Sequence, residues 1–428
     1  MVGMGKRKYN LTTGIVIGAL AGLVCGLVFG EKMGSFKLLG DVFLRLMQMP
    51  IILLIMTAVV EAVGSLKPRE LGRLGLKILL LFALSTALAG LLGLSMGYIM
   101  QPGAGLQIEG VLDISKVTVP KPASFSEQLL GYVSNNMFAS MAGGNNLQCI
   151  VISILFGITL SVYGAKNEKN PVLDLVREVN KVVMQFIFIA IQILPLAIFS
   201  FISYAVGVIG VQVLGTLAKL ILANLVGAVI LFVIFATIAC VYCKVSPLKF
   251  FPKSVRMTII ALMSASSAVT LPVKMEDGEK RFGISPRINR LVAPMGMSMN
   301  SDGAVLFFCL SAVTVSQVFG MPLSASQLIT LVLFSTAFSF AAISVPGGGL
   351  VMLAVVLTSV GLPVEGMVII AAADFFLGPI RTVGNSVDDV MIAMIVAKSE
   401  GEFDPAIYND EKEFDPGVFS YKENAAQQ

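Results

Sequence analysis

The sequence predicts an all-α polytopic membrane protein with eight transmembrane helices and two re-entrant helical hairpins. Apolar residues make up 56% of its 428 residues and charged residues only 13%, which lies outside the usage of soluble domains. Apolar runs of about 18 residues or more, long enough to cross a bilayer as helices, recur along most of the chain. Basic residues gather in alternate connections between these runs, and such a bias sets the orientation of membrane helices.

The eight spans follow from the apolar runs, and their orientation follows from the basic residues. We expect spans at about 11–30, 41–64, 75–100, 132–163, 172–207, 212–243, 288–318 and 364–397. Lysine and arginine precede the first span and follow the second, fourth and sixth, whereas the connections 208–211 and 319–325 carry neither. We therefore expect a multi-pass protein of the plasma membrane with both termini in the cytoplasm.

Two further apolar segments, at about 249–281 and 322–360, are broken in the middle. The first has basic residues at both ends and the second at neither, so each should enter and leave the membrane on one side. Their tips run from Ser264 to Pro272 and from Ser339 to Gly349. Irregular backbone at membrane depth is tolerated only where it lines a cavity or is covered by protein, so these tips indicate a binding site. For each tip alone, the alternative is close helix packing by small residues.

The last span carries a polar stripe. Asp374, Arg381, Asn385 and Asp389 are separated by multiples of about one helical turn and therefore share one face. Each ion at a helix centre costs roughly 2.5–3.5 kcal/mol on insertion scales. We therefore expect this face to line a water-filled cavity or a bound ion.

The seventh span contains Asn300, Asp302 and Gly303, a sequence that predicts local unwinding. Carbonyl, amide and carboxylate oxygens are the hard ligands that an alkali cation prefers. A kink with an interhelical hydrogen bond is the alternative. The chain has no histidine, which excludes imidazole as a metal ligand or proton relay. Each hairpin followed by a polar-interrupted span has the form of an inverted repeat, which places substrate and ions near the bilayer midplane.

At these residues the chain resembles the dicarboxylate/amino acid:cation symporter family, which includes the glutamate and aspartate transporters. The resemblance extends from the first span to about Lys398, and its most specific motifs are Thr270-Leu-Pro272, Asn300-x-Asp302-Gly303, Pro346-Gly-Gly-Gly349 and the stretch from Asp374 to Asp389. Inverted repeats are a known property of this family, so they are not an independent prediction. The resemblance implies the glutamate-transporter-homologue fold and a secondary active symporter without catalytic residues or a prosthetic group. It also implies a homotrimer, a small anionic substrate, no nucleic-acid partner, and a mobile domain that moves like an elevator.

The resemblance also implies a division of the chain. Segments 1–74 and 132–211 would form a fixed scaffold, 75–131 and 212–398 the transport domain, and 399–428 a cytoplasmic tail. We expect this tail to be a solvated segment.

The resemblance assigns roles to individual residues. Arg381 would bind a substrate carboxylate with its planar fork and Asn385 would hydrogen-bond the substrate. The remaining substrate-binding positions implied are Thr382, Gly378, Ser266, Ser267, Val345, Gly347 and Gly349.

Three cation sites are implied in the same way. One would use Asp389 with carbonyls of Gly296, Asn300 and Asn385. The second would use Ser298 with carbonyls of Ser339, Phe340 and Ala342. The third would use Asp302 and Asn300 with Ser85 and Thr86. Because these oxygen-ligand positions are retained and histidine is absent, the sequence favours Na⁺ over H⁺ as the coupling ion.

Three positions depart from the amino acid carriers of the family. Gly378 stands where those carriers place an aspartate for the substrate's amino group, Ala304 replaces a threonine, and Phe82 replaces a tyrosine. A buried ammonium without a carboxylate partner binds poorly. We therefore favour a C4-dicarboxylate over an amino acid, with Asp374 or Asp388 left open as a substitute partner for an amine.

Two other classes of protein fit the composition less well. A channel needs polar residues along its whole pore rather than two tips that meet in the membrane. An intramembrane aspartyl protease needs two carboxylates that share a proton. Arg381 on the same face as Asp374 opposes this arrangement, since a guanidinium favours the ionised carboxylate.

Overall fold

The computed structural model describes residues 11–64, 73–106, 133–167, 170–339 and 348–414. Regular structure in these residues is helical, apart from an isolated antiparallel bridge between Ile284 and Phe403. Five helices are apolar and long enough to cross a membrane, and the bent last helix makes a sixth if its two halves form one span. The all-α polytopic fold is therefore confirmed, while the number of eight spans stays a prediction.

Two expected spans are interrupted in the structure. The segment 41–64 is divided into α2 (Lys37–Gln48) and α3 (Ile51–Gly64), and the segment 172–207 into α8 (Pro171–Ile191) and α9 (Leu194–Tyr204). Pro50 and Pro195 lie at these breaks. Proline lacks an N–H and cannot donate to the helix before it, whereas it is well tolerated at a helix start, as Pro195 is in α9.

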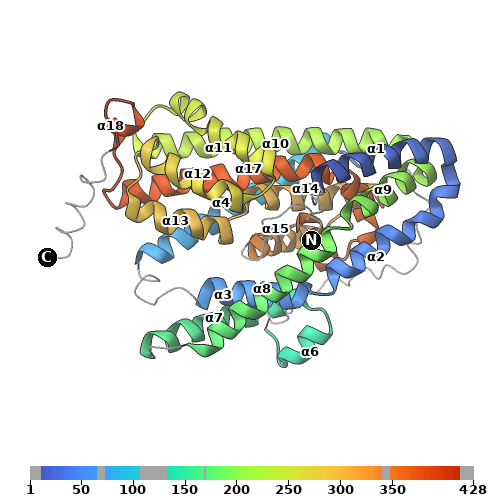
Figure 1. Ribbon diagram of the computed structural model, residues 1–428, viewed down its shortest axis with the longest axis horizontal. Coiled ribbons are helices and arrows are strands. Elements are labelled where there is room, and N and C mark those ends of the chain that lie inside the picture. Colours follow the sequence, from blue (N-terminus) through green and yellow to red (C-terminus); the bar gives the residue numbers. More distant parts are fainter. Residues whose placement is uncertain (1–10, 65–72, 107–132, 168–169, 340–347, 415–428) are drawn as a thin grey trace, which may run out of the picture.

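A first group of helices lies at one end of the molecule (Figure 1), where α9 packs against both α1 (Leu11–Phe29) and α2. Gly18 and Gly22 make this approach possible, because a Cβ at either position would lie 2.4 Å or 2.7 Å from a carbonyl oxygen of α9. Such small-residue faces drive helix association in membranes.

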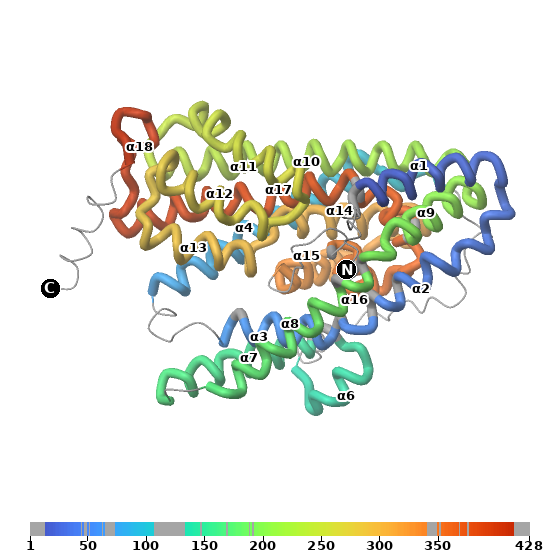
Figure 2. The backbone as a smooth tube through the Cα atoms, in the orientation of Figure 1, coloured from blue at the N-terminus to red at the C-terminus, as the bar shows by residue number. Residues whose placement is uncertain are grey.

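A second group forms a layer of its own (Figures 1 and 2), consisting of α3, α8 and α7 (Asn146–Lys166), with the short α6 (Met137–Ala142) beside it. The helix α7 begins 14 residues later than the span expected at 132–163.

The central group surrounds the polar residues of the last span. It consists of α4 (Arg73–Met100), α10 (Gln212–Cys243), α13 (Pro286–Met299), α14 (Asp302–Val318) and α17 (Met367–Ser399). The α13–α14 span is 94% buried over its most apolar window, as expected for a helix with apolar residues on every side. Close packing against α4 requires Gly93, where a Cβ would lie 2.4 Å from the carbonyl oxygen of Leu306.

The first hairpin consists of α11 (Phe250–Ser264) and α12 (Ser267–Lys280). Its turn is shorter than the sequence predicted, because Pro272 lies inside α12 and only Ala265 and Ser266 separate the two helices. Ala265 takes the left-handed conformation (φ 46°). Thr270 explains why helix resumes so early, since both its N–H and its hydroxyl donate to the carbonyl of Ser266.

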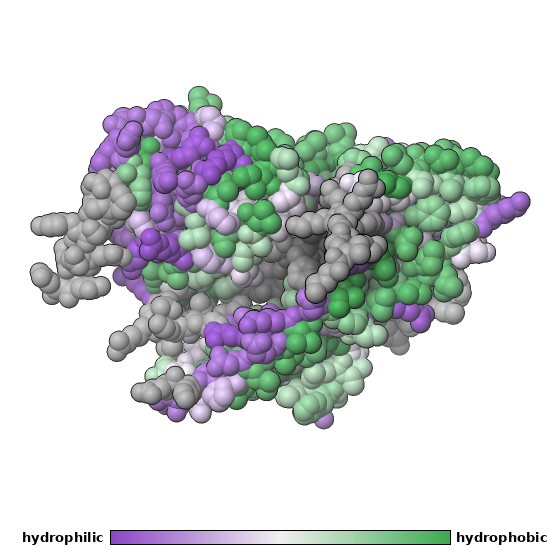
Figure 3. Space-filling model, in the orientation of Figure 1, coloured by the Kyte–Doolittle hydropathy of each residue, from purple (hydrophilic) through white to green (hydrophobic). Residues whose placement is uncertain are grey.

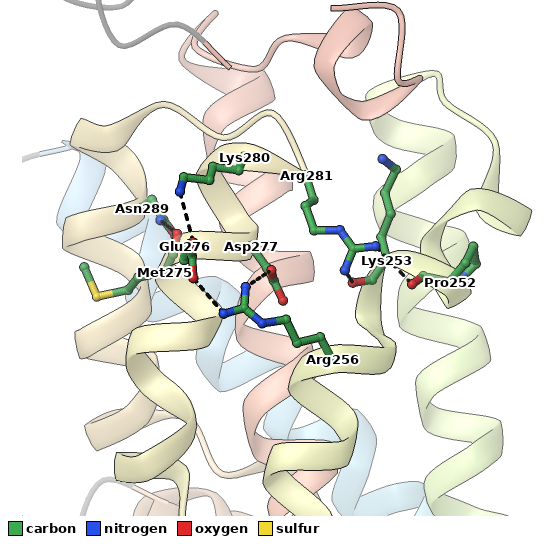
Figure 4. A network of polar contacts seen from close by, with 9 residues as sticks. All are labelled: Pro252, Lys253, Arg256, Met275, Glu276, Asp277, Lys280, Arg281 and Asn289. Atoms are coloured by element: carbon green, nitrogen blue, oxygen red, sulfur yellow. Dashed lines mark hydrogen bonds and ion pairs between the residues drawn. The ribbon is translucent and has the colours of Figure 1, made fainter. Parts of the chain in front are cut away.

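A polar network joins the two limbs of the first hairpin at its base (Figure 4). Arg256 of α11 contacts Glu276 at 2.8 Å and Asp277 at 3.1 Å, both on α12. Arg281 donates to the carbonyl oxygen of Lys253 at 3.0 Å. The segment therefore enters and leaves at the same end, as expected for a re-entrant hairpin.

The second hairpin consists of α15 (Ala325–Ser339) and α16 (Gly348–Ser359), and its tip at 340–347 lies outside the described residues. The Nε2 of Gln327, near the start of α15, donates to the carbonyl oxygen of Val360 just after α16 at 2.7 Å. This bond brings the two ends of the segment together, in agreement with the expected hairpin.

The first part of the tail is folded, which differs from the solvated segment that we expected. The short α18 (Pro405–Tyr408) packs at the base of the first hairpin, where Figure 3 shows hydrophilic residues gathered at one end of the molecule. Tyr408 is fully buried, packs against Phe282 and Phe403, and donates to the carbonyl oxygen of Ser246 at 2.9 Å. The segment folds despite its polar composition, because the free energy gained by burying an aromatic ring is larger than the contribution of a charged side chain that stays in water.

An ion pair holds the end of this folded segment. The Lys253 ammonium lies 2.5 Å from the Asp410 carboxylate. Its hydrogen bond holds the pKa of Asp410 below the usual range. Asp410 is mostly exposed, so the pair contributes little to stability by itself.

Replacing Tyr408 should show that the folded tail stabilises the end of the protein against which it packs. Tyr408→Ala leaves a cavity and should cost about 3 kcal/mol. Thermal unfolding in detergent, followed by fluorescence-detected size exclusion, would show this as a lower melting temperature. The control Tyr242→Ala removes a half-exposed tyrosine of α10 and should leave the melting temperature unchanged. Equal stability of the two variants would contradict the role given to Tyr408.

Candidate functional site

The polar stripe of α17 lies inside the protein. Asp374, Arg381 and Asp389 are at most 7% exposed. The helix bends by 83° between Val364–Asp374 and Phe376–Ser399. Pro379 accounts for the position of the bend, because a proline clashes with the carbonyl four residues earlier and leaves it without a helical partner.

The Arg381 guanidinium occupies a narrow slot. It lies 4.7 Å from the centre of the Phe307 ring, a cation–π distance. Gly349 of the second hairpin lies on it as well, since a Cβ there would be 2.4 Å from the Arg381 Cζ. The Nη1 is 3.2 Å from the Oδ1 of Asp374, the only hydrogen bond of this guanidinium to a described residue. A planar cation held at fixed orientation is suited to recognising a carboxylate.

Asn385 joins α17 to the start of α14. Its Oδ1 accepts a hydrogen bond from the N–H of Ala304 at 3.1 Å. The same N–H donates to the carbonyl of Ser301 at 3.0 Å, a shared bond of the kind common at helix ends. The helices touch here, since a Cβ at Gly303 would lie 2.2 Å from the carbonyl oxygen of Arg381. Thr382 donates to the carbonyl of Gly378 in its own helix. The structure therefore places Arg381, Thr382, Asn385 and Gly378 together along one stretch of α17.

The seventh span is unwound where the sequence predicted it. α13 ends at Met299, α14 begins at Asp302, and the two residues between them are not helical. The Oδ1 of Asn300 accepts hydrogen bonds from Ser85 and Thr86 of α4, each at 3.2 Å. The Ser85 hydroxyl, which has a single hydrogen to donate, also lies 3.2 Å from the Oδ1 of Asp302. The four residues predicted for the third cation site therefore converge, and their oxygen atoms are the ligand type that an alkali cation prefers.

Asp389 contacts a residue that the sequence did not associate with it. Its Oδ2 lies 2.5 Å from the Nζ of Lys274 on α12, and its Oδ1 accepts from the Nδ2 of Asn300 at 3.1 Å. Gly296 lies directly against the carboxylate, since a Cβ there would be 2.2 Å from the Oδ1. Lys274 is one of the basic residues near the end of the segment 249–281, from which the sequence predicted a cytoplasmic hairpin base, but it is fully buried. Its spacing from Ser267 and Thr270, which places all three on one face of α12, was the available signal.

The other predicted ligands are placed in part. Ser339 is buried and donates to the carbonyl of Met299 at 3.2 Å, whereas Ser298, its predicted partner in the second cation site, is exposed and, within the described part of the chain, forms no hydrogen bond with it. Ser266, the N-cap residue of α12, and Ser267, its first residue, are both buried. The predicted positions outside the described residues are Phe340, Ala342, Val345 and Gly347.

Asp388 is a further buried carboxylate, next to Asp389 on α17. It is 1% exposed, and neither of its oxygens has a hydrogen-bond partner among the described residues. The ion pairs of the described chain include neither Asp388 nor Asp302. Negative charge therefore exceeds positive charge in this part of the interior when these carboxylates are ionised.

A helical membrane protein with a buried guanidinium beside a cluster of oxygen ligands belongs to the class of membrane transporters. The chain is a member of the sodium:dicarboxylate symporter family, whose pattern matches residues 11–399. It is 33% identical over 420 residues to the proton/glutamate-aspartate symporter of Escherichia coli strain K12, covering 94% of this chain and 95% of that protein.

Two other relatives are similar over nearly their whole length. The proton/sodium-glutamate symport protein of Bacillus caldotenax is 32% identical over 418 residues, covering 95% of this chain and 97% of the relative. The C4-dicarboxylate transport protein of Bacillus subtilis strain 168 is 31% identical over 409 residues, covering 94% and 96%. The protein is thus a transporter rather than an enzyme, coupled to cations and specific for a small anion, either a dicarboxylate or an acidic amino acid.

Changing Gly349 should disturb the orientation of Arg381. The Cβ of Gly349→Ala would force the guanidinium to move, and we expect substrate affinity to fall about tenfold, which is about 1.4 kcal/mol. Isothermal titration with succinate and with aspartate would measure it. Gly215→Ala, at a helical position with open space around it, is the control and should bind like the parent protein. Unchanged affinity in Gly349→Ala would show that the contact does not position Arg381.

Proposed function

We propose that the protein is a Na⁺-coupled symporter of C4-dicarboxylates. The observation that carries the proposal is the guanidinium of Arg381 beside Gly378, at a position where a carboxylate would be needed to bind an amino group. A Cβ at Gly378 would have the Arg381 Nη2 as its nearest neighbour, at 3.7 Å. An anionic group is therefore favoured here, and an ammonium group is not.

Neither candidate substitute for the missing carboxylate fits well. Asp374 and Gly378 lie on opposite sides of the 83° bend of α17, and the Oδ1 of Asp374 contacts Arg381. Asp388 is ten residues further along α17, which corresponds to about 15 Å. An amino acid symporter, as the names of two relatives suggest for those proteins, would need a third amine partner.

Charge balance supports cation coupling. A dicarboxylate would add two negative charges to an interior where Asp302 and Asp388 already form no ion pair with a described residue. Charges leave water only when they are paired, so the anion should bind together with cations. The hydroxyl, amide and carboxylate oxygens around Asn300 suit Na⁺, which is why we propose Na⁺ rather than H⁺.

We also propose the architecture implied by the family resemblance. The scaffold would consist of 1–74 and 132–211, and the transport domain of 75–131 and 212–398, which would carry substrate across by an elevator motion within a homotrimer in the plasma membrane. The separate packing of α1, α2 and α9, and of α3, α7 and α8, supports this division. Both termini would be cytoplasmic.

Transport assays in proteoliposomes test the proposal directly. An inward Na⁺ gradient should drive uptake of radiolabelled succinate, and replacing Na⁺ with choline should abolish it. Counterflow should exchange labelled for unlabelled succinate, which a channel cannot do. Uptake that is driven by a pH gradient in the absence of Na⁺ would show that the coupling ion is H⁺ rather than Na⁺. Counterflow of aspartate but not of succinate would make the protein an amino acid carrier.

Removing the guanidinium should abolish recognition of the anion. Arg381→Ala removes charge-assisted hydrogen bonds to the substrate, so succinate affinity should fall on the order of 100-fold, as measured by isothermal titration. Arg177→Ala, which removes an exposed arginine paired with Asp174, is the control. Full succinate uptake by Arg381→Ala would contradict the proposal that Arg381 binds a carboxylate of the substrate.

Adding a carboxylate at position 378 should shift the substrate preference. A Cβ at Gly378 meets Arg381 only at an ordinary contact distance of 3.7 Å, so Gly378→Asp adds a carboxylate without a clash at the Cβ. We expect the affinity ratio of aspartate to succinate to rise at least about tenfold, about 1.4 kcal/mol. Competition against bound label would measure the ratio. Gly378→Asn has the same shape without the charge and should show no such shift. Equal ratios in the two variants would mean that another group selects against amines.

A further inference from the structure

The Lys274–Asp389 pair lies in the protein interior at a place where the resemblance expects a bound cation. It joins α12 of the first hairpin to α17 across 115 residues of sequence. The side chains are 0% and 1% exposed. A buried ion pair is weak evidence for stability, because desolvation opposes its attraction, so another role should be sought.

The surroundings of Asp389 show what the Lys274 ammonium does there. One carboxylate oxygen contacts the ammonium, the other contacts the amide of Asn300, and the backbone of Gly296 lies against the carboxyl group. These are the groups that the resemblance assigns to one alkali cation. The Nζ contacts the Oδ2 directly and therefore takes the place beside this carboxylate that a bound cation would need.

We propose that the Lys274 ammonium permanently takes the place of an alkali cation at Asp389, so that this carrier couples transport to one Na⁺ fewer than its three candidate sites would allow. The inference rests on the proposed cation coupling. A tethered charge neutralises Asp389 but is never released from the protein. It therefore takes no energy from a Na⁺ gradient.

The Asp302 cluster behaves differently and serves as an internal comparison. Its ligands are the hydroxyls of Ser85 and Thr86 and the amide oxygen of Asn300. No described cationic side chain forms an ion pair with Asp302. An exchangeable cation thus remains suited to this cluster while Asp389 is neutralised by the chain itself.

Removing the ammonium should create a Na⁺ site. In purified full-length protein, Lys274→Met leaves Asp389 without its cation. Equilibrium dialysis with ²²Na⁺ should then detect one more bound Na⁺ per protomer than in the parent. Lys274→Met/Asp389→Asn removes both charges and should return the count to that of the parent. Lys280→Met, an exposed lysine of the same helix, should also match the parent.

Several outcomes would overturn the inference. An unchanged Na⁺ count in Lys274→Met would do so, as would a gain that persists in the double variant. If Lys274→Met does not fold, Lys274→Gln keeps a hydrogen-bond donor and is used instead. The unmodified protein gives a separate test, because three bound Na⁺ ions per protomer would contradict the proposal, whereas at most two are expected.

The same measurements separate this inference from the proposed function. ²²Na⁺ dialysis needs no substrate, so it reports on Asp389 even if succinate is not transported. A protein that binds no Na⁺ and takes up no succinate would refute the proposed function. An extra Na⁺ in Lys274→Met would still support the exchange of ammonium for metal.

Discussion

The burial of ions on α17 is the constraint on which the rest of the structure depends. Charges at the centre of a membrane protein persist only when other groups compensate for lost water. Asp374 and the Phe307 ring provide this for Arg381, and Lys274 with Asn300 for Asp389. These partners come from helices on several sides, so α17 must lie at the centre of its group.

Close backbone approach makes this arrangement possible. A side chain at Gly303 would collide with the backbone of α17, and one at Gly296 or Gly349 would collide with the Asp389 carboxylate or the Arg381 guanidinium. The break after Met299 lies at the same place, and Asn385 of α17 shares the N–H of Ala304 at the start of α14 with the carbonyl of Ser301. The non-helical residues between α13 and α14 and the buried charged side chains of α17 therefore stabilise each other.

The same pairing explains why the interior suits transport rather than catalysis or conduction. Asp374 and Asp389 each contact a cationic side chain, whereas an aspartyl dyad needs two carboxylates that share a proton. The α13–α14 span is apolar and buried along most of its length, so it does not line a continuous polar pore. A closed site that neutralises an anion with cations can cross the apolar region as a unit, and this is the physical requirement for a symporter.

The sequence by itself determined the fold class, the stripe on α17, the unwinding near Asp302 and the two hairpins, because hydrophobicity and spacing report on single helices. Tertiary structure decided which helices face each other. Lys274 looked like a cytoplasmic charge and proved to be the partner of Asp389, and Tyr408 looked like part of a solvated tail and proved to be buried. The reason is physical: the periodicity of a helix identifies a face, but the residue opposite that face comes from another part of the chain and is fixed only by packing.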